Sequence, residues 1–254
     1  MPSAFELIRR VILVAGEAAL LYAISRLLFE WVLRAAWGRS TARRLVVDIL
    51  RAPGNILHEM SHALGYLIGG YGVSRLVPAF IDPNGRGYCR PGRRWAPWAV
   101  QWLATGLAAL MPLFTGALAL WLISWALGVP EDPRELAITA DWRRLIDLLL
   151  SLDYYALRTW VFLLLALSIG VELAPSDIDL KASLPALAVA TTLTIGGILV
   201  VFELDRFAPY RTAVDVYVGW AMSWASSVLS FGIMALLLVG IPAVVVTWPL
   251  RRRR

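Results

Sequence analysis

The sequence is poor in cysteine, in lysine and in charged residues generally. Cys89 is the only cysteine, so the chain can form no intramolecular disulfide, and zinc ribbons built from several cysteines are excluded. Only 17% of the 254 residues are charged, whereas 59% are hydrophobic. Soluble domains carry about 25% charged residues. This composition, with a mean hydropathy of +0.67, predicts a polytopic membrane protein.

Arginine supplies nearly all of the positive charge, since Lys181 is the only lysine and the formal net charge is +6. In a membrane protein such an excess is typical of the cytoplasmic side and of contact with lipid headgroups. The chain contains no RNA- or DNA-binding motif, so we expect no nucleic acid among its partners. Glu17 interrupts the first apolar run and no cleavage site follows, so we expect a retained span rather than a signal peptide.

Apolar segments of about 18 residues or more can cross the bilayer as helices, and they fill most of the chain. We predict an all-α polytopic membrane protein with about six membrane helices and one short β-hairpin. We treat the chain as one integral-membrane domain. Residues 1–52 would supply the first span and an amphipathic surface segment, residues 53–204 the core, and residues 205–254 the last span and a basic tail. The apolar segments are residues 11–33, 54–70, 95–127, 155–174, 184–204 and 214–248.

Proline and glycine predict where some of these segments end. Pro53-Gly54 should break the chain before the histidine segment, and Gly69-Gly70 should end that segment. Pro112 should kink or divide the long apolar helix that contains it.

The remaining segments are more polar. Residues 71–94 alternate between apolar and polar side chains around Pro83-Asn84-Gly85, which predicts the hairpin. The arginine-rich residues 34–51 and the acidic residues 131–153 are amphipathic, so we expect both to lie along a membrane surface.

The chain's only two histidines lie in the motif HEMSH, with His58 and His62 one helical turn apart. Two imidazoles at this spacing lie on one face of a helix and can bind one zinc ion. Glu59 lies beside the first histidine, where its carboxylate can take a proton from a metal-bound water. The motif therefore predicts a hydrolytic metal centre.

The motif is short and occurs by chance in many proteins, where its histidines simply lie at a surface. Here that interpretation is weaker, because ionisable groups inside a membrane cost about 2.5–3.5 kcal/mol each and are seldom retained without a partner or a task. We therefore favour a metal site.

A catalytic zinc needs a third protein ligand, which must come from a carboxylate, since no further histidine remains and Cys89 is a poor candidate. Our first choice is Asp177, in a Pro-Ser-Asp break between two spans, and our second is Asp179. Both aspartates also look like ordinary residues at a helix start. The acidic residues flanked by apolar sequence are Glu17, Glu172, Asp177, Asp179 and Glu203.

Two stretches resemble the site-2 protease class of intramembrane zinc metalloproteases, and especially its small prokaryotic relatives: PGNILHEMSHALGYLIGG and the later APSDIDLKASLP. The resemblance covers about the central half of the chain. It implies a zinc bound by the two histidines and an aspartate, a glutamate as the base, and cleavage of membrane-embedded segments of other proteins. His58, Glu59 and His62 match the motif directly. The Leu-Asp-Gly context of the family's aspartate is absent, so Asp177 is assigned by position.

Charge predicts a topology. If Asp177 meets the histidines, the start of the histidine helix and the loop near Asp177 must face the same side of the membrane. A re-entrant histidine helix satisfies this condition and puts most arginines on one side, opposite residues 131–153, with the metal near the cytoplasm. A full crossing with two passes around Pro112 also satisfies it, but leaves the arginines of residues 75–94 outside.

We therefore predict a zinc metallopeptidase of a prokaryotic cytoplasmic membrane, with a transmembrane protein as its substrate. Two other functions stay open: a non-catalytic metal-binding scaffold or pseudoprotease, and a transporter with the histidines on an ion path. A membrane zincin of another class, using Glu172 or Glu203 as its third ligand, also stays open.

Overall fold

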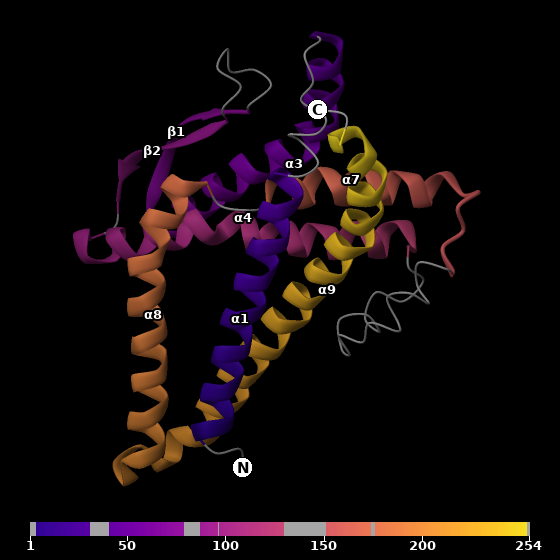
Figure 1. Cartoon of the computed structure of the whole chain (residues 1–254). Coiled ribbons are helices and arrows are strands. Elements are labelled where there is room, and N and C mark those ends of the chain that lie inside the picture. Colours follow the sequence, from indigo (N-terminus) through magenta and orange to yellow (C-terminus); the bar gives the residue numbers. More distant parts are fainter. Residues whose placement is uncertain are drawn as a thin grey trace.

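The computed structural model describes residues 4–30, 41–78, 87–95, 97–129, 151–173 and 176–252. Apart from one two-stranded antiparallel sheet, the regular elements are helices (Figure 1). In chain order they are α1 (Ala4–Leu28), α3 (Thr41–Ile68), β1 (Tyr71–Val77), β2 (Tyr88–Arg94), α4 (Trp98–Leu127), α7 (Leu157–Glu172), α8 (Asp177–Glu203), the 3-10 helix η2 (Asp205–Tyr210) and α9 (Arg211–Arg252).

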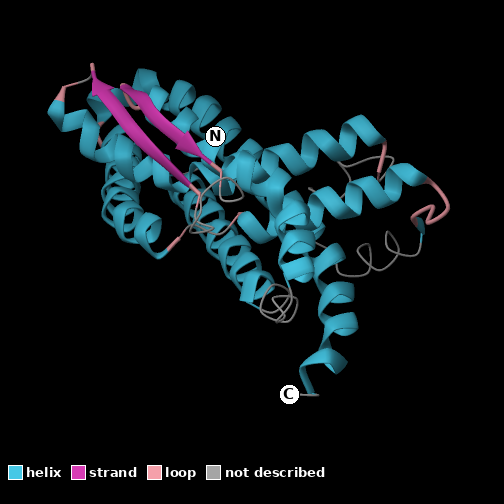
Figure 2. Ribbon diagram, turned by 90° about the horizontal axis from the view of Figure 1, so that it is seen from above, coloured by secondary structure: helices cyan, strands magenta, loops and turns pink. Residues whose placement is uncertain are grey.

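Helices α1, α8 and α9 run lengthwise through the molecule, and α4 lies across their upper parts (Figure 1). The histidine helix α3 packs against α4 and α7 at this same end. The hairpin of β1 and β2 contacts α3, and in the view from above its strands lie over the helices on one side (Figure 2). The site residues therefore gather at one end of the long helices.

Four of the six described α-helices are long and apolar enough to cross a membrane. The segments that qualify are Ala4–Leu28, Ala104–Leu127, Asp179–Glu203 and Phe207–Pro242. Helix α7 has 16 residues, fewer than the roughly 20 that a crossing needs. We predicted about six membrane helices, and four helices in the described part of the chain meet the length and composition that a crossing needs.

The main apolar core forms where α9 meets α1, α4 and α7. The α9 residues Leu229, Phe231 and Leu236 are almost wholly buried and belong to one cluster with Leu120 of α4 and Phe162 of α7. Between helices in a membrane, side chains of this size stabilise the packing through van der Waals contact rather than through the removal of apolar surface from water. The core thus ties the last helix to the middle of the chain.

The predicted break at Pro53-Gly54 is wrong, because α3 continues through both residues. Proline removes one backbone hydrogen bond from a helix. Tertiary packing compensates here: the Gly54 N–H donates to the Ser168 hydroxyl of α7, at 2.9 Å, and a Cβ at position 54 would overlap the Ser168 carbonyl. Glycine at this position thus allows α3 and α7 to approach closely, just before the histidines.

The other expectations have mixed outcomes. Helix α4 continues through Pro112 and is not divided. The histidine helix ends as predicted, with Gly70 at φ 79°, a left-handed conformation that glycine adopts without strain. The hairpin is confirmed in its two strands, while its tip at residues 79–86 lies outside the described part. The acidic residues 131–150 lie outside it as well.

Candidate metal centre

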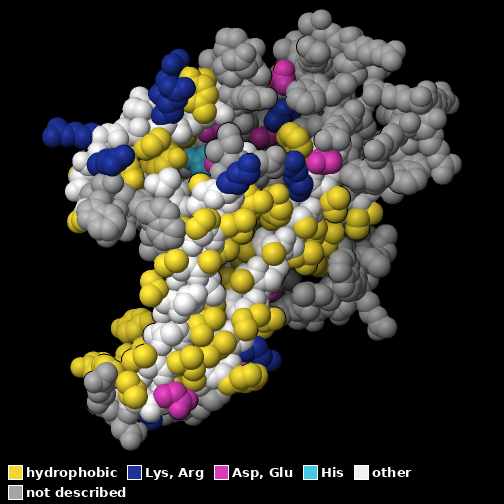
Figure 3. Space-filling model, turned by 60° about the vertical axis from the view of Figure 1, so that its left-hand side comes forward, with side chains coloured by type: hydrophobic (Ala, Val, Ile, Leu, Met, Phe, Trp, Pro, Cys, Tyr) yellow, Lys and Arg dark blue, Asp and Glu magenta, His cyan; other side chains and the backbone are white. Residues whose placement is uncertain are grey.

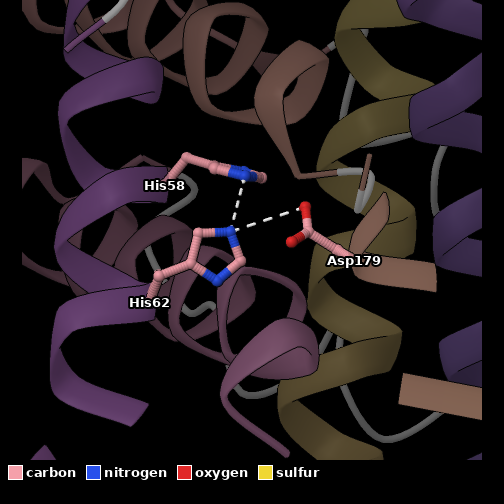
Figure 4. A group of neighbouring side chains, drawn as sticks. All are labelled: His58, His62 and Asp179. Carbon is pink, nitrogen blue, oxygen red and sulfur yellow. Dashed lines mark hydrogen bonds and ion pairs between the residues drawn. The ribbon is translucent and has the colours of Figure 1, made fainter. Parts of the chain in front are cut away.

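One face of α3 carries a stripe of polar side chains. Arg51, Asn55, His58 and His62 follow one another at intervals of four, three and four residues, which keeps them on the same side of a helix. The stripe faces the junction between α7 and α8, which contains Glu172 and Asp179. Figure 4 shows the two imidazoles of α3 and the Asp179 carboxylate of α8 pointing toward one another. These three side chains are the centre of the site.

Backbone carbonyl groups set the orientation of both imidazoles. His58 Nδ1 lies 2.6 Å from the carbonyl oxygen of Glu172, and His62 Nδ1 lies 3.0 Å from that of Ala108. A carbonyl can only accept a hydrogen bond, so we assign the ring proton to Nδ1 in both residues. In the neutral rings, each Nε2 then carries a lone pair.

These two lone pairs face each other. The Nε2 atoms of His58 and His62 are 3.1 Å apart. Two hydrogen-bond acceptors at this distance repel each other unless a cation lies between them, either a metal ion or an additional proton. Metal-bound histidines commonly donate their other ring N–H to a backbone carbonyl, as both of these do.

Asp179 adds a carboxylate to the pair. Its Oδ2 lies 3.6 Å from His62 Nε2, and the three ligand atoms lie within 4.8 Å of one another. Ligand atoms about 2.0–2.2 Å from a tetrahedral zinc are about 3.3–3.6 Å apart, so two of the observed separations are close to that geometry. His58, His62 and Asp179 could therefore hold a metal ion.

Asp179 has a second task at the start of α8. Ser176 is the N-cap residue, and its hydroxyl accepts a hydrogen bond from the Asp179 N–H while the Asp179 carboxylate accepts one from the Ser176 N–H. This capping box folds the third residue of the helix back toward the site. Asp177 is the first residue of α8, and its side chain lies outside the described part of the chain.

Glu172 supports the site without belonging to the three-residue group. Its carboxylate accepts a 2.5 Å hydrogen bond from Arg51 Nε and lies 3.5 Å from Asn55 Nδ2, while its backbone carbonyl holds His58. The ion pair is largely buried, with side-chain exposures of 14% and 9%. Arg51 and Asn55 were not among the site residues predicted from the sequence. Their spacing from His58 could have indicated them, because it places both on the histidine face of the helix.

Glu59 lies in the turn between the histidines and is only 4% exposed. Its Oε2 is buried and has no hydrogen-bond partner among the described residues. Gly87, just before β2, lies so close that a Cβ there would overlap the Glu59 carboxylate. The hairpin backbone thus covers the carboxylate next to the candidate metal group.

The remaining candidates lie apart from this group. Glu17 of α1 accepts hydrogen bonds from two serines of α9, and Glu203 lies at the far end of α8 from Asp179. Burial, with a smaller contribution from the charge of Glu59, raises the pKa of the Cys89 thiol to about 11. Cys89 therefore stays protonated at neutral pH and is not prepared as a thiolate ligand.

An apolar cavity of about 290 Å³ lies between α3 and α4, and one of its lining residues, Ala108, provides the carbonyl that contacts His62. It is lined by Gly65, Ile68, Gly69, Ala104, Leu107, Ala108, Leu110, Met111 and Phe114. The small residues at its base allow the two helices to lie close together, because a Cβ at Gly65 would overlap Ala108. A cavity of this kind can accept an apolar side chain.

The chain was compared with protein-family models, with curated proteins and with solved structures. None of them matches it.

Proposed function

We propose that this protein is a zinc-dependent intramembrane endopeptidase that cleaves membrane-embedded segments of other proteins. The observation that carries the proposal is the pair of imidazoles whose Nε2 atoms face each other at 3.1 Å beside the Asp179 carboxylate. Two histidines and a carboxylate are a donor set typical of catalytic zinc. The resemblance of residues 53–70 to the site-2 protease class supports the same activity.

Each residue of the site has a role in this proposal. His58, His62 and Asp179 would hold the zinc, and their rings and carboxylate are already oriented by Glu172, Ala108 and Ser176. When bound, zinc supplies Lewis-acid polarisation of the scissile carbonyl and an acidified water. Glu59 accepts the proton of the attacking water and returns it to the leaving amine. The partnerless Oε2 of Glu59 is consistent with a carboxylate reserved for that proton.

The membrane is part of the proposal. The four apolar helices suit a multi-pass protein of the cytoplasmic membrane, and the site lies at the end of the long helices where the hairpin carries its arginines (Figures 1 and 3). The positive-inside rule puts this end toward the cytoplasm. A transmembrane protein substrate would unwind locally there, with one apolar side chain in the cavity between α3 and α4.

A non-catalytic metal-binding protein is the main rival, because it would use the same three ligands. The position of Glu59 favours catalysis: a purely structural metal site has no need of a buried carboxylate with a partnerless oxygen next to its ligands. Metal content alone does not separate the two functions, so the test must also measure cleavage.

The test uses the full-length chain in liposomes with fluorescent single-span peptides that carry a helix-breaking Gly-Pro pair. We expect about one zinc per chain and peptide cleavage that stops on chelation and resumes when zinc is restored. Zinc binding without cleavage of any peptide would favour the scaffold, and cleavage that survives complete metal removal would refute the proposal. A His62→Ala chain is the control for the metal content.

A further inference from the structure

The outer face of the hairpin places two arginines directly opposite each other. In the antiparallel register, Arg75 of β1 pairs with Arg90 of β2, and Val77 pairs with Tyr88. Directly opposite residues of an antiparallel pair project to the same face. Like charges in this position destabilise a sheet unless an anion lies between them. The pair thus resembles a site for an anion.

Tyr88 holds both guanidinium groups over one ring. Arg75 Cζ lies 5.6 Å from the ring centroid and Arg90 Cζ lies 5.0 Å from it. Stacking on an aromatic ring restricts the two side chains, so less entropy is lost when they bind a ligand. Two positioned guanidinium groups are well suited to the bidentate recognition of phosphate.

All the charged residues in the described part of the hairpin are arginines. Arg75, Arg90, Arg93 and Arg94 are all exposed, and among the residues that the structure describes no carboxylate forms an ion pair with them. Figure 3 shows most of the visible Lys and Arg side chains at the upper end of the molecule, together with a few Asp and Glu, above helices whose surface is largely hydrophobic. An anionic partner would relieve this concentration of positive charge.

Membrane lipid is the source of phosphate that the neighbouring elements favour. Helix α8 begins at the same end, and only 11% of its apolar span is buried within the protein. Trp95 follows Arg94 directly and is 66% exposed, and its backbone N–H donates to the Gly70 carbonyl at the base of the hairpin. Exposed tryptophan next to arginine is typical of the headgroup level of a membrane.

We propose that Arg75, Tyr88 and Arg90 form a binding site for the phosphate group of an anionic phospholipid. The hairpin then rests on the headgroups of the leaflet that surrounds α8, with its other face against α3. This site does not depend on zinc or on peptidase activity. Failure of the lipid-binding test would therefore not contradict the proposed function. Failure of the peptidase test would likewise not contradict the lipid site.

The test titrates the full-length chain in detergent micelles with phosphatidylglycerol and counts retained lipid by native mass spectrometry. Arg75→Gln with Arg90→Gln should weaken retention roughly ten- to thirtyfold, because each basic residue at an anionic surface contributes to binding. The matched control is Arg9→Gln with Arg10→Gln, which also removes two positive charges but from side chains that already contact Glu6. Circular dichroism checks that each variant keeps its helices.

Two further measurements distinguish a built site from general charge. Arg75→Lys with Arg90→Lys keeps the charge but loses bidentate geometry, so we expect it to bind clearly less than wild type. Equal losses in the control pair, or wild-type retention in the lysine pair, would overturn the site. Inorganic phosphate is the last probe. Displacement of phosphatidylglycerol only at high phosphate concentration fits a lipid site, whereas tight phosphate binding without lipid would overturn the lipid assignment.

Discussion

Two carboxylates in the described part of the chain, those of Glu17 and Glu59, have a buried oxygen without a hydrogen-bond partner. The other oxygen of Glu17, in α1, accepts hydrogen bonds from Ser226 at 2.8 Å and Ser230 at 3.0 Å, one turn apart on α9. Glu59 lies between two histidines whose ring nitrogens converge. The first carboxylate joins two helices, and the second stands beside a group of potential metal ligands.

The comparison shows that a buried carboxylate does not by itself identify a functional site. Serine hydroxyls that donate across a helix interface explain Glu17 as part of the packing between α1 and α9. Packing does not explain two imidazoles whose acceptor atoms face each other, because that arrangement is unfavourable without a cation. Substitutions at the two carboxylates should therefore affect different properties: stability at Glu17 and catalysis at Glu59.

The largest difference should appear in turnover. Glu59→Gln should lower peptide cleavage about 10²- to 10⁴-fold, the usual contribution of a general base, without loss of bound zinc. Glu17→Gln is the matched control and should cleave at nearly the wild-type rate. Cleavage and zinc content are measured on the same liposome preparations. Normal turnover in Glu59→Gln would remove Glu59 from the mechanism.

The next effect concerns the third ligand. Asp179→Asn keeps an oxygen for the N-cap hydrogen bond but removes the carboxylate, so we expect zinc affinity to fall by more than about 100-fold. Asp177→Asn changes the neighbouring acid in the same way and should bind zinc normally. Competition with a chromogenic chelator measures both affinities. If the Asp177 variant is the weaker binder, the ligand is Asp177, as the sequence predicted.

A smaller effect should follow from the buried ion pair between Arg51 and Glu172. Arg51→Lys keeps the charge but changes the contact that positions the carbonyl acceptor of His58, so zinc affinity should fall about 10- to 100-fold. Arg9→Lys is the control, since the Arg9 pair with Glu6 is exposed and contributes little. Thermal unfolding of the zinc-free protein separates a loss of fold from a loss of positioning. An unchanged zinc affinity in Arg51→Lys would show that the ion pair between Arg51 and Glu172 only packs α3 against α7.

The smallest effect should occur at Glu17. Glu17→Ala removes two interhelical hydrogen bonds, each contributing about 0.6–1.7 kcal/mol in a membrane, so the free energy of unfolding should fall by about 1–3 kcal/mol. Glu17→Gln should lose less, because its amide oxygen still accepts from the serines. Unfolding in mixed micelles measures both variants. A lower zinc affinity in Glu17→Ala would contradict the separation of the two clusters.

Local pattern was sufficient to predict part of the site. His58 and His62 share a face on any helix that contains them, because they are one turn apart. The hairpin and the end of α3 were also predictable, since glycine and alternating polarity act within a few residues. The third ligand was harder: the position of each aspartate depends on where α8 begins, and that start is set by the hydroxyl of Ser176.

Contacts between distant segments were not predictable from local pattern. Arg51 and Glu172 are 121 positions apart, and their pairing depends on the close approach of α3 and α7 at Gly54. The same approach explains why Pro53 does not end the helix. The apolar span of α8 is only 11% buried within the protein, whereas that of α9 is 67% buried. Hydropathy could not predict this difference, because the two spans are about equally apolar.

One oxygen atom, Asp179 Oδ2, serves both the start of α8 and the group around His62. Any ion that draws this oxygen toward the histidines must weaken its hold on the Ser176 amide. Occupancy of the site would then loosen the first turn of a helix 27 residues long. The amide hydrogen of Ser176 should thus exchange with solvent faster when the site holds an ion than when it does not.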